Sequence, residues 1–254
     1  MSSTTSDTLV EAFQRDGYVV VSGLFSDREL DALDTAMAAL QRGVATGAID
    51  RARYAGDYLT SAAPGETLPF VNYVKDVTTL SAEADAAFTH PVLVELIRRG
   101  LDVDDVWRFG EEHGSRFGVV YQDSRPGQES GYSRIGWHSD HQAFPNSDFF
   151  PSVALTLHLD ATSPANGFLR VVPGSHLWPT DGMPLGFEKI AGEVAVYCDR
   201  GDVILHHCDL WHSAARATED PPGGIRRHLR GSWNAGRRPE PGEEIEAFNK
   251  NAAR

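Results

Sequence analysis

The stretch Val153-Ala154-Leu155-Thr156-Leu157-His158-Leu159 decides how the second half of the chain folds. Large apolar residues alternate with smaller or polar ones, which is the period of a β-strand with one buried and one partly polar face. Similar short segments flank it, separated by clusters of Gly, Pro, Asn or Asp. They span residues 117–121, 168–172, 194–197, 203–206 and 228–233. This half is therefore predicted to form β-sheets.

The first half carries helical patterns instead. The predicted elements are a short helix ending at Gly17, a strand over residues 18–21, a helix opened by the capping-box pair Ser26 and Glu29 and reaching Gly43, and a helix from Pro91 to Gly100. Helices followed by strands predict an α+β, mainly β protein with a sandwich or barrel as its main body. We expect a single domain over residues 1–254, with 8–110 a mainly helical flank, 115–235 the strand core and 236–254 a tail.

Composition narrows the function classes. The 254 residues carry a formal net charge of −13, which would repel the phosphates of nucleic acid or an anionic membrane. No apolar run approaches the length of a membrane span, and the first residues lack the pattern of a secretory signal. The two cysteines, Cys198 and Cys208, are interpreted as reduced and buried. These features predict a cytoplasmic protein, a monomer or small homo-oligomer, with a small-molecule partner.

One motif carries chemistry. His138 and Asp140 are two residues apart, so on a strand their side chains would point to the same face, and His212 follows a later strand-like run. Two histidines and one carboxylate form the set that holds non-haem Fe(II) while leaving coordination positions open. These residues are the predicted catalytic and metal-binding set.

The chain resembles the phytanoyl-CoA dioxygenase-like family of Fe(II)- and 2-oxoglutarate-dependent oxygenases. The resemblance covers residues 8–235 and rests on motifs in a shared order. They are Phe13-x-x-x-Gly17-Tyr18-Val19-Val20, His138-x-Asp140, Asn166-Gly167-Phe168-Leu169, Val172-Pro173-Gly174-Ser175-His176, Gly201-Asp202-Val203 and Trp211-His212. It implies a double-stranded β-helix, or jelly-roll, core with flanking N-terminal helices. It also implies His138, Asp140 and His212 as iron ligands, with 2-oxoglutarate and O2 as cosubstrates.

The resemblance further implies an arginine that binds the distal carboxylate of 2-oxoglutarate. Arg226 is the first candidate, because it opens an Arg-Arg-hydrophobic stretch after the distal histidine; Arg227 and Arg230 are the alternatives. A guanidinium suits this role because it can bind a carboxylate through two parallel hydrogen bonds. The other candidates for cosubstrate contact are Thr156, Tyr121 and Gln122.

The expected activity is hydroxylation of a small molecule, an amino-acid derivative or a specialised-metabolite intermediate, with release of succinate and CO2. Predicted substrate contacts are Arg134, Trp137, His141, Phe144 and Trp233. Two alternatives stay open: a cupin-like metalloenzyme that does not use 2-oxoglutarate, and a non-catalytic jelly-roll binding module. The first would have no need of Arg226, and the second would have no need of the three metal ligands.

Overall fold

The structure of the chain is a computed structural model. It describes residues 3–55, 59–60, 67–108, 118–122, 135–143, 151–179, 182–183, 186–215, 217–219 and 225–238. Within this part of the chain, no helix is both long and apolar enough to cross a lipid bilayer.

The strands of the second half form two antiparallel sheets. They are β6 (Gly118–Gln122), β7 (Ile135–His138), β8 (Ser152–His158), β9 (Leu169–Val171), β10 (Val194–Val196), β11 (Val203–His207), β12 (His212–Ala214) and β13 (Arg226–Ala235). The major sheet contains β11-β8-β13-β6 in that order, and the minor sheet has the order β10-β9-β12-β7. Successive strands cross from one sheet to the other, except for β9 and β10, which pair within the minor sheet, and this order makes the core a jelly roll. The predicted fold class, α+β and mainly β, is confirmed.

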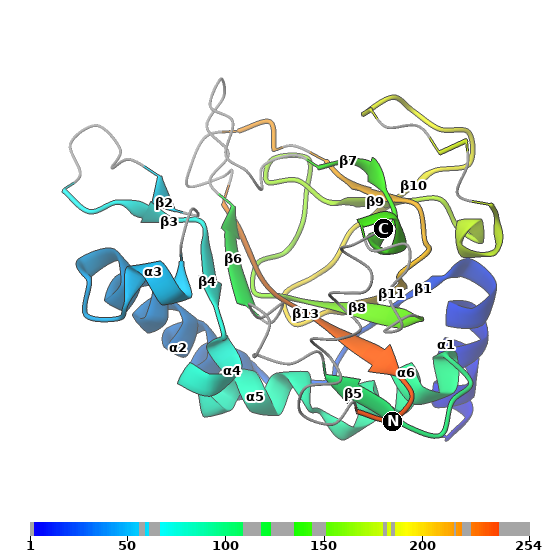
Figure 1. Cartoon of the computed structure of the whole chain (residues 1–254), viewed down its shortest axis with the longest axis horizontal. Coiled ribbons are helices and arrows are strands. Elements are labelled where there is room, and N and C mark those ends of the chain that lie inside the picture. Colours follow the sequence, from blue (N-terminus) through cyan, green and yellow to red (C-terminus); the bar gives the residue numbers. More distant parts are fainter. Residues whose placement is uncertain are drawn as a thin grey trace, which may run out of the picture.

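The first half supplies both helices and further strands. The helices are α1 (Ser3–Asp16), α2 (Asp27–Thr46), α3 (Arg51–Tyr54), α4 (Val77–Leu80), α5 (Ala82–Phe88) and α6 (Pro91–Gly100), and the strands are β1 (Tyr18–Val21), β2 (Leu59–Thr60), β3 (Phe70–Val71), β4 (Tyr73–Lys75) and β5 (Val106–Arg108). β1 and β4 extend the two edges of the major sheet, and β5 pairs with β13. Figure 1 shows these helices packed along the major sheet on the side away from the minor sheet. The helical flank therefore completes the major sheet as well as covering it.

Helix α2 begins where the sequence predicts and ends later. The side chain of Ser26 accepts from the backbone of Glu29, whose carboxylate accepts in return from the Ser26 backbone, so the capping box is present. The helix passes through Gly43 and ends at Gly47, which has a φ of 82°. A Cβ atom on Gly43 would lie 2.7 Å from the Ile49 side chain. Gly43 therefore serves close packing, and Gly47 is the glycine that stops the helix.

The two faces of the major sheet have different surroundings. On the helix side, Leu155, Leu157, Leu205 and Leu229 belong to one large buried cluster with apolar residues of the helices. The next residues along the same strands point the other way, toward the minor sheet. The pocket described below lies on that inner side, between the two sheets.

Candidate active site

Three candidate metal ligands meet between the sheets. The Nε2 atoms of His138 and His212 each lie 4.0 Å from Oδ1 of Asp140, and the two ring centroids are 4.1 Å apart. His138 ends β7 and His212 begins β12, and the two residues are paired in register. The expectation that His138 and Asp140 share one strand is wrong: β7 stops at His138, and Asp140 is the first residue of the short helix α7 (Asp140–Ala143). The chain turns between them and still brings the carboxylate to the imidazoles.

Both imidazoles are oriented for metal binding. Nδ1 of His138 lies 2.9 Å from the Gly136 carbonyl oxygen, and Nδ1 of His212 lies 2.9 Å from that of Leu210. A carbonyl only accepts hydrogen bonds, so each Nδ1 carries the proton and each Nε2 keeps its lone pair for a metal. Two atoms bound to one ion at about 2.1 Å can be at most about 4.2 Å apart. The 4.0 Å separations lie below this limit.

The charges at this site favour the forms that bind a metal. Burial lowers the pKa of His138 and holds the pKa of His212 well below its usual value, so both rings are neutral at neutral pH. Burial acts to raise the pKa of Asp140, but the neighbouring His206, His212 and Arg230 hold it well below its usual value. Two neutral imidazoles and one carboxylate need release no proton before they bind a cation.

His206 and Arg230 lie against the metal carboxylate. Nε2 of His206 is 3.5 Å from Oδ2 of Asp140, and a terminal nitrogen of Arg230 is 3.6 Å from Oδ1. Both residues come from strands of the major sheet, whereas His138 and His212 come from the minor sheet. The major sheet therefore supplies the two side chains that orient the carboxylate.

A pocket extends from the candidate ligands between the two sheets. The major sheet contributes side chains at alternate positions of its central strands: Val120, Thr156, His158, Ile204, His206, Arg226, His228 and Arg230. The minor sheet contributes Ile135, His138, Leu169, His212 and Ala214. The walls thus combine apolar residues with histidines and two arginines.

Arg226 is buried in this pocket and is 5% exposed. Its Nε makes no hydrogen bond to any described residue, and no described carboxylate forms an ion pair with it. Burial lowers its pKa from 12.5 to about 10, so the guanidinium is still charged at neutral pH. A buried cation without a partner is costly, which points to an anionic ligand.

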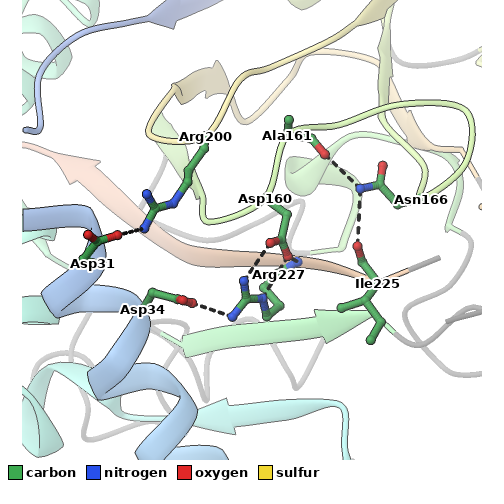
Figure 2. Close-up of polar contacts among 8 residues, drawn as sticks. All are labelled: Asp31, Asp34, Asp160, Ala161, Asn166, Arg200, Ile225 and Arg227. Carbon is green, nitrogen blue, oxygen red and sulfur yellow. Dashed lines mark hydrogen bonds and ion pairs between the residues drawn. The ribbon is translucent and has the colours of Figure 1, made fainter. Parts of the chain in front are cut away.

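The alternative arginines lie elsewhere. Arg227 is on the helix side of β13, where it donates to Asp160 and to Asp34 of α2 (Figure 2). Its guanidinium is engaged and does not line the pocket. Arg230 lines the pocket beside Asp140, at the metal end. Only Arg226 combines burial in the pocket with the absence of any described acidic partner.

The other candidates for cosubstrate contact divide by strand face. Thr156 lines the pocket. Tyr121 lies on the opposite face of β6, in the helix-side core, where burial raises its pKa. It does not contact the pocket, because neighbouring residues of a strand point in opposite directions. Gln122 is paired in register with Arg226, and its side chain lies outside the described part.

The predicted substrate contacts lie mostly away from the pocket. Trp137 is buried in a separate cluster behind the minor sheet, with Arg170 stacked over its ring at 4.7 Å. Trp233 is buried in the helix-side core. Nδ1 of His141 is 2.7 Å from Asp209, and the ring is not among the described pocket-lining groups. None of these three side chains is among the described residues that line the pocket, so their role as substrate contacts stays a prediction. Arg134 and Phe144 lie outside the described residues.

Sequence reasoning missed three pocket histidines: His158, His206 and His228. The two-residue period of the strands could have identified two of them. His158 is two residues after Thr156, and His228 is two residues after Arg226, so each shares the pocket-facing side of its strand. His206 faces the same pocket from β11.

A second group of potential ligands has its donor atoms engaged. His207, Cys208 and Asp209 lie within 4.8 Å of one another. However, Nδ1 of His207 accepts from the backbone of Asp209, and Sγ of Cys208 accepts from the backbone of Ser152. Burial also raises the pKa of the Cys208 thiol to about 12, which keeps it protonated. This group is therefore a weaker metal site than the first.

Comparison with known proteins gives a consistent result. The sequence model of a family described as phytanoyl-CoA dioxygenase matches residues 13–222. An ectoine dioxygenase from Sphingopyxis alaskensis is 30% identical over 236 residues, covering 80% of this chain and 68% of the relative. An iron/alpha-ketoglutarate-dependent dioxygenase, ausU, from Aspergillus calidoustus is 31% identical over 100 residues, which is 37% of this chain. The matched part is 32% of the length of that fungal relative.

Solved structures share the fold. The crystal structure of the non-haem alpha-ketoglutarate-dependent epimerase SnoN from nogalamycin biosynthesis has a TM-score of 0.66 at 21% identity, covering 92% of this chain and 84% of that one. EctD from S. alaskensis, solved with 2-oxoglutarate and 5-hydroxyectoine, has a TM-score of 0.64 at 22% identity, covering 92% and 76%. Both similarities extend over nearly the whole of this chain.

Proposed function

The chain belongs to the phytanoyl-CoA dioxygenase family, and we propose that it is an Fe(II)- and 2-oxoglutarate-dependent dioxygenase that hydroxylates a small molecule. Succinate and CO2 would be released from the cosubstrate. The observation that carries this proposal is that one pocket contains both the candidate metal ligands and a buried arginine. His138 and His212 line it beside Asp140. Arg226, which is buried and has no acidic partner among the described residues, lines the same pocket four residues before Arg230 on β13.

The residues fit the two groups that the proposal requires. His138, Asp140 and His212 would hold the iron, whose remaining coordination positions suit 2-oxoglutarate and O2. Arg226 would bind the distal carboxylate of the cosubstrate through parallel hydrogen bonds. When bound, iron with 2-oxoglutarate supplies the oxidising power for attack on an unactivated C–H bond.

The chain's own contribution is orientation and the exclusion of water. His206 and Arg230 hold the Asp140 carboxylate from the major sheet, so its metal-facing oxygen keeps one position. Ile135, Leu169, Ile204 and Ala214 give the pocket apolar walls. Such walls keep bulk water from the reacting atoms and strengthen the electrostatic interactions between the sheets.

The alternatives explain less of the pocket. A cupin-like metalloenzyme that does not use 2-oxoglutarate accounts for the three ligands but leaves Arg226 as a buried charge without a role. A binding module without activity gives no reason for the three ligands to lie together. Burial of a guanidinium that pairs with no described carboxylate is costly enough that a ligand for it is the simpler explanation.

Substrate class and setting follow as parts of the same proposal. A relative is named ectoine dioxygenase, and a protein of the same fold was solved with 5-hydroxyectoine, which supports an amino-acid derivative or a specialised-metabolite intermediate as substrate. The net charge of −13 argues against nucleic acid or an anionic membrane as a partner. A cytoplasmic location, a single domain over residues 1–254 and a monomeric or small homo-oligomeric state stay predictions.

The test is an anaerobic titration of the purified protein with Fe(II) and 2-oxoglutarate, followed by the visible charge-transfer band of the chelate. The proposal expects a band in the wild type, none in Asp140→Ala and a much weaker one in Arg226→Ala at equal cosubstrate. Bound iron without a band would favour the cupin-like alternative. Failure to bind iron would favour the binding module.

A further inference from the structure

Two histidines beside Arg226 have no role in the proposed function so far. His158 and His228 are directly paired in register between β8 and β13, and their ring centroids are 5.8 Å apart. Arg226 lies two residues before His228 on β13, so its side chain leaves the same face of the sheet. All three side chains line the pocket. They therefore form one polar group on its inner face.

Several buried nitrogens of these side chains make no hydrogen bond within the described part of the chain. His158 is 3% exposed, and neither of its ring nitrogens makes a hydrogen bond to a described residue. Within the same described set, Nδ1 of His228 and Nε of Arg226 are also buried without a hydrogen bond. Native proteins rarely leave several adjacent buried polar groups unsatisfied. Their clustering in a pocket points to a ligand that accepts hydrogen bonds.

The charge of the group selects the ligand chemistry. Burial, and then Arg226, lower the pKa of His158 to about 3, and the same two causes hold the pKa of His228 well below its usual value. Both rings are thus neutral at neutral pH, and each offers one N–H donor. Of the described residues, Arg230 also acts on His228, and the Cys198 thiol beside Arg226 has its pKa raised to about 12 by burial and so stays neutral. One cation with two neutral donors suits a single negative charge.

A carboxylate matches this donor set in number as well as in charge. Its two oxygens offer about four lone-pair sites. Two parallel hydrogen bonds from Arg226 would use two of them, and one N–H from each imidazole would use the other two. The anion would then be satisfied without water.

The distance of His158 and His228 from the metal site matches the length of 2-oxoglutarate. Arg230 contacts Asp140, and Thr156 is paired with Arg230, so this row of the sheet lies beside the metal site. His158 and His228 form the next inward-facing row, about 6.6 Å away at about 3.3 Å per residue. An extended 2-oxoglutarate places its two carboxyl carbons about 5 Å apart, across four C–C bonds of about 1.5 Å. Its distal carboxylate would therefore reach the histidine row.

We propose that His158 and His228 complete, with Arg226, a closed carboxylate-binding end of the pocket that holds the distal carboxylate of 2-oxoglutarate and limits the length of the 2-oxo acid accepted. The inference rests on the proposed function. It adds two binding residues to the arginine and gives them a role in cosubstrate selection.

The test measures binding rather than turnover. Protein loaded with Zn(II), which does no redox chemistry, is titrated with 2-oxoglutarate by calorimetry. His158→Leu and His228→Leu remove one donor each and should weaken binding about tenfold or more, because each loses a hydrogen bond to a charged group. His158→Gln and His228→Gln keep an N–H donor and should lose less. Zn(II) affinity should be unchanged in all four.

A second measurement tests which length of 2-oxo acid the pocket accepts. His158→Ala and His228→Ala enlarge the closed end, so the preference for 2-oxoglutarate over the longer 2-oxoadipate should fall about tenfold or more. The control is His90→Asn, which keeps a capping side chain at the start of α6, far from the pocket, and should bind both acids as the wild type does.

The outcomes separate the two proposals. If Zn(II)-loaded wild type does not bind 2-oxoglutarate, the proposed function fails. If the wild type binds and Arg226→Gln does not, while the leucine variants bind as tightly as the wild type, only the role of the histidines is wrong. If His158→Leu does not fold, the less buried His228→Leu and the two glutamine variants still decide the question. Glutamine variants that bind no better than the leucine variants would also overturn it.

Discussion

Arg227 donates hydrogen bonds to both carboxylate oxygens of Asp160, from Nε to Oδ2 at 2.9 Å and from Nη2 to Oδ1 at 2.7 Å. Its remaining terminal nitrogen donates to Asp34, which ties β13 to helix α2 (Figure 2). The neighbouring Arg226 leaves the opposite face of β13 and enters the pocket without a described partner. Adjacent arginines on one strand thus serve different parts of the molecule.

Exchanging each of these arginines should separate cosubstrate binding from stability. Arg226→Gln should weaken 2-oxoglutarate binding about tenfold to a hundredfold, because a charge-assisted hydrogen bond contributes about 1.5–3 kcal/mol. Arg227→Gln should leave this affinity unchanged and lower the free energy of unfolding by about 1–3 kcal/mol, since it leaves Asp160 and Asp34 unpaired. Calorimetry and urea denaturation measure the two effects. Loss of 2-oxoglutarate binding in Arg227→Gln alone would reverse the assignment.

Iron content should depend on the group His138, Asp140 and His212, and not on the group His207, Cys208 and Asp209. Asp140→Ala removes the anionic ligand and should leave less than a tenth of the wild-type iron after dialysis, with no succinate release. Asp209→Ala is the matched control, because it removes a carboxylate from the second group and should retain one iron per chain. Metal analysis of the purified proteins measures the iron content of both variants. Normal iron content in Asp140→Ala would contradict the assignment of the ligands.

The buried His158 should make the metal-free protein sensitive to acid. In the unfolded chain its pKa is about 6.5, whereas in the folded protein it is about 3. Between these values the unfolded state binds more protons, so stability is full above pH 6.5 and is lost as the pH falls toward 3. The contribution is about 1.4 kcal/mol per pH unit. The excess stability of the wild type over His158→Gln should therefore shrink between pH 6.5 and pH 5 in urea denaturation. Parallel curves would show that the imidazole is not kept neutral.

The turn at Gly167 should be intolerant of a side chain. Gly167 has a φ of 89°, and a Cβ atom there would lie 2.5 Å from the carbonyl oxygen of Ala215, just beyond β12. Gly167→Ala should cost about 1–2 kcal/mol for the left-handed backbone and more for the contact. Gly192→Ala is the control, because its φ is 83° and nothing lies within 4 Å of the added atom. Equal losses of stability in urea denaturation would mean that the close approach to Ala215 is unimportant.

Local sequence predicts the elements of this fold well where one periodic pattern dominates. The alternation over 153–159 corresponds to β8, and the pair Ser26 and Glu29 opens α2. Prediction fails where one residue serves two purposes. A glycine such as Gly43 is typical of a helix end. Here its missing side chain makes room for Ile49, and only the packed structure shows that contact.

The sequence by itself determined the mainly β class, the three candidate ligands and the arginine-rich strand after them, because residue type and strand period are local properties. The jelly roll followed from the resemblance to a known family. Only the tertiary structure decided which face of each strand meets the pocket. It directed Arg226 inward and Arg227 toward α2, and it buried Tyr121, Trp137 and Trp233 elsewhere. It also brought His158 and His228 together, 70 residues apart in the chain, since strand pairing is a long-range interaction that no local pattern specifies.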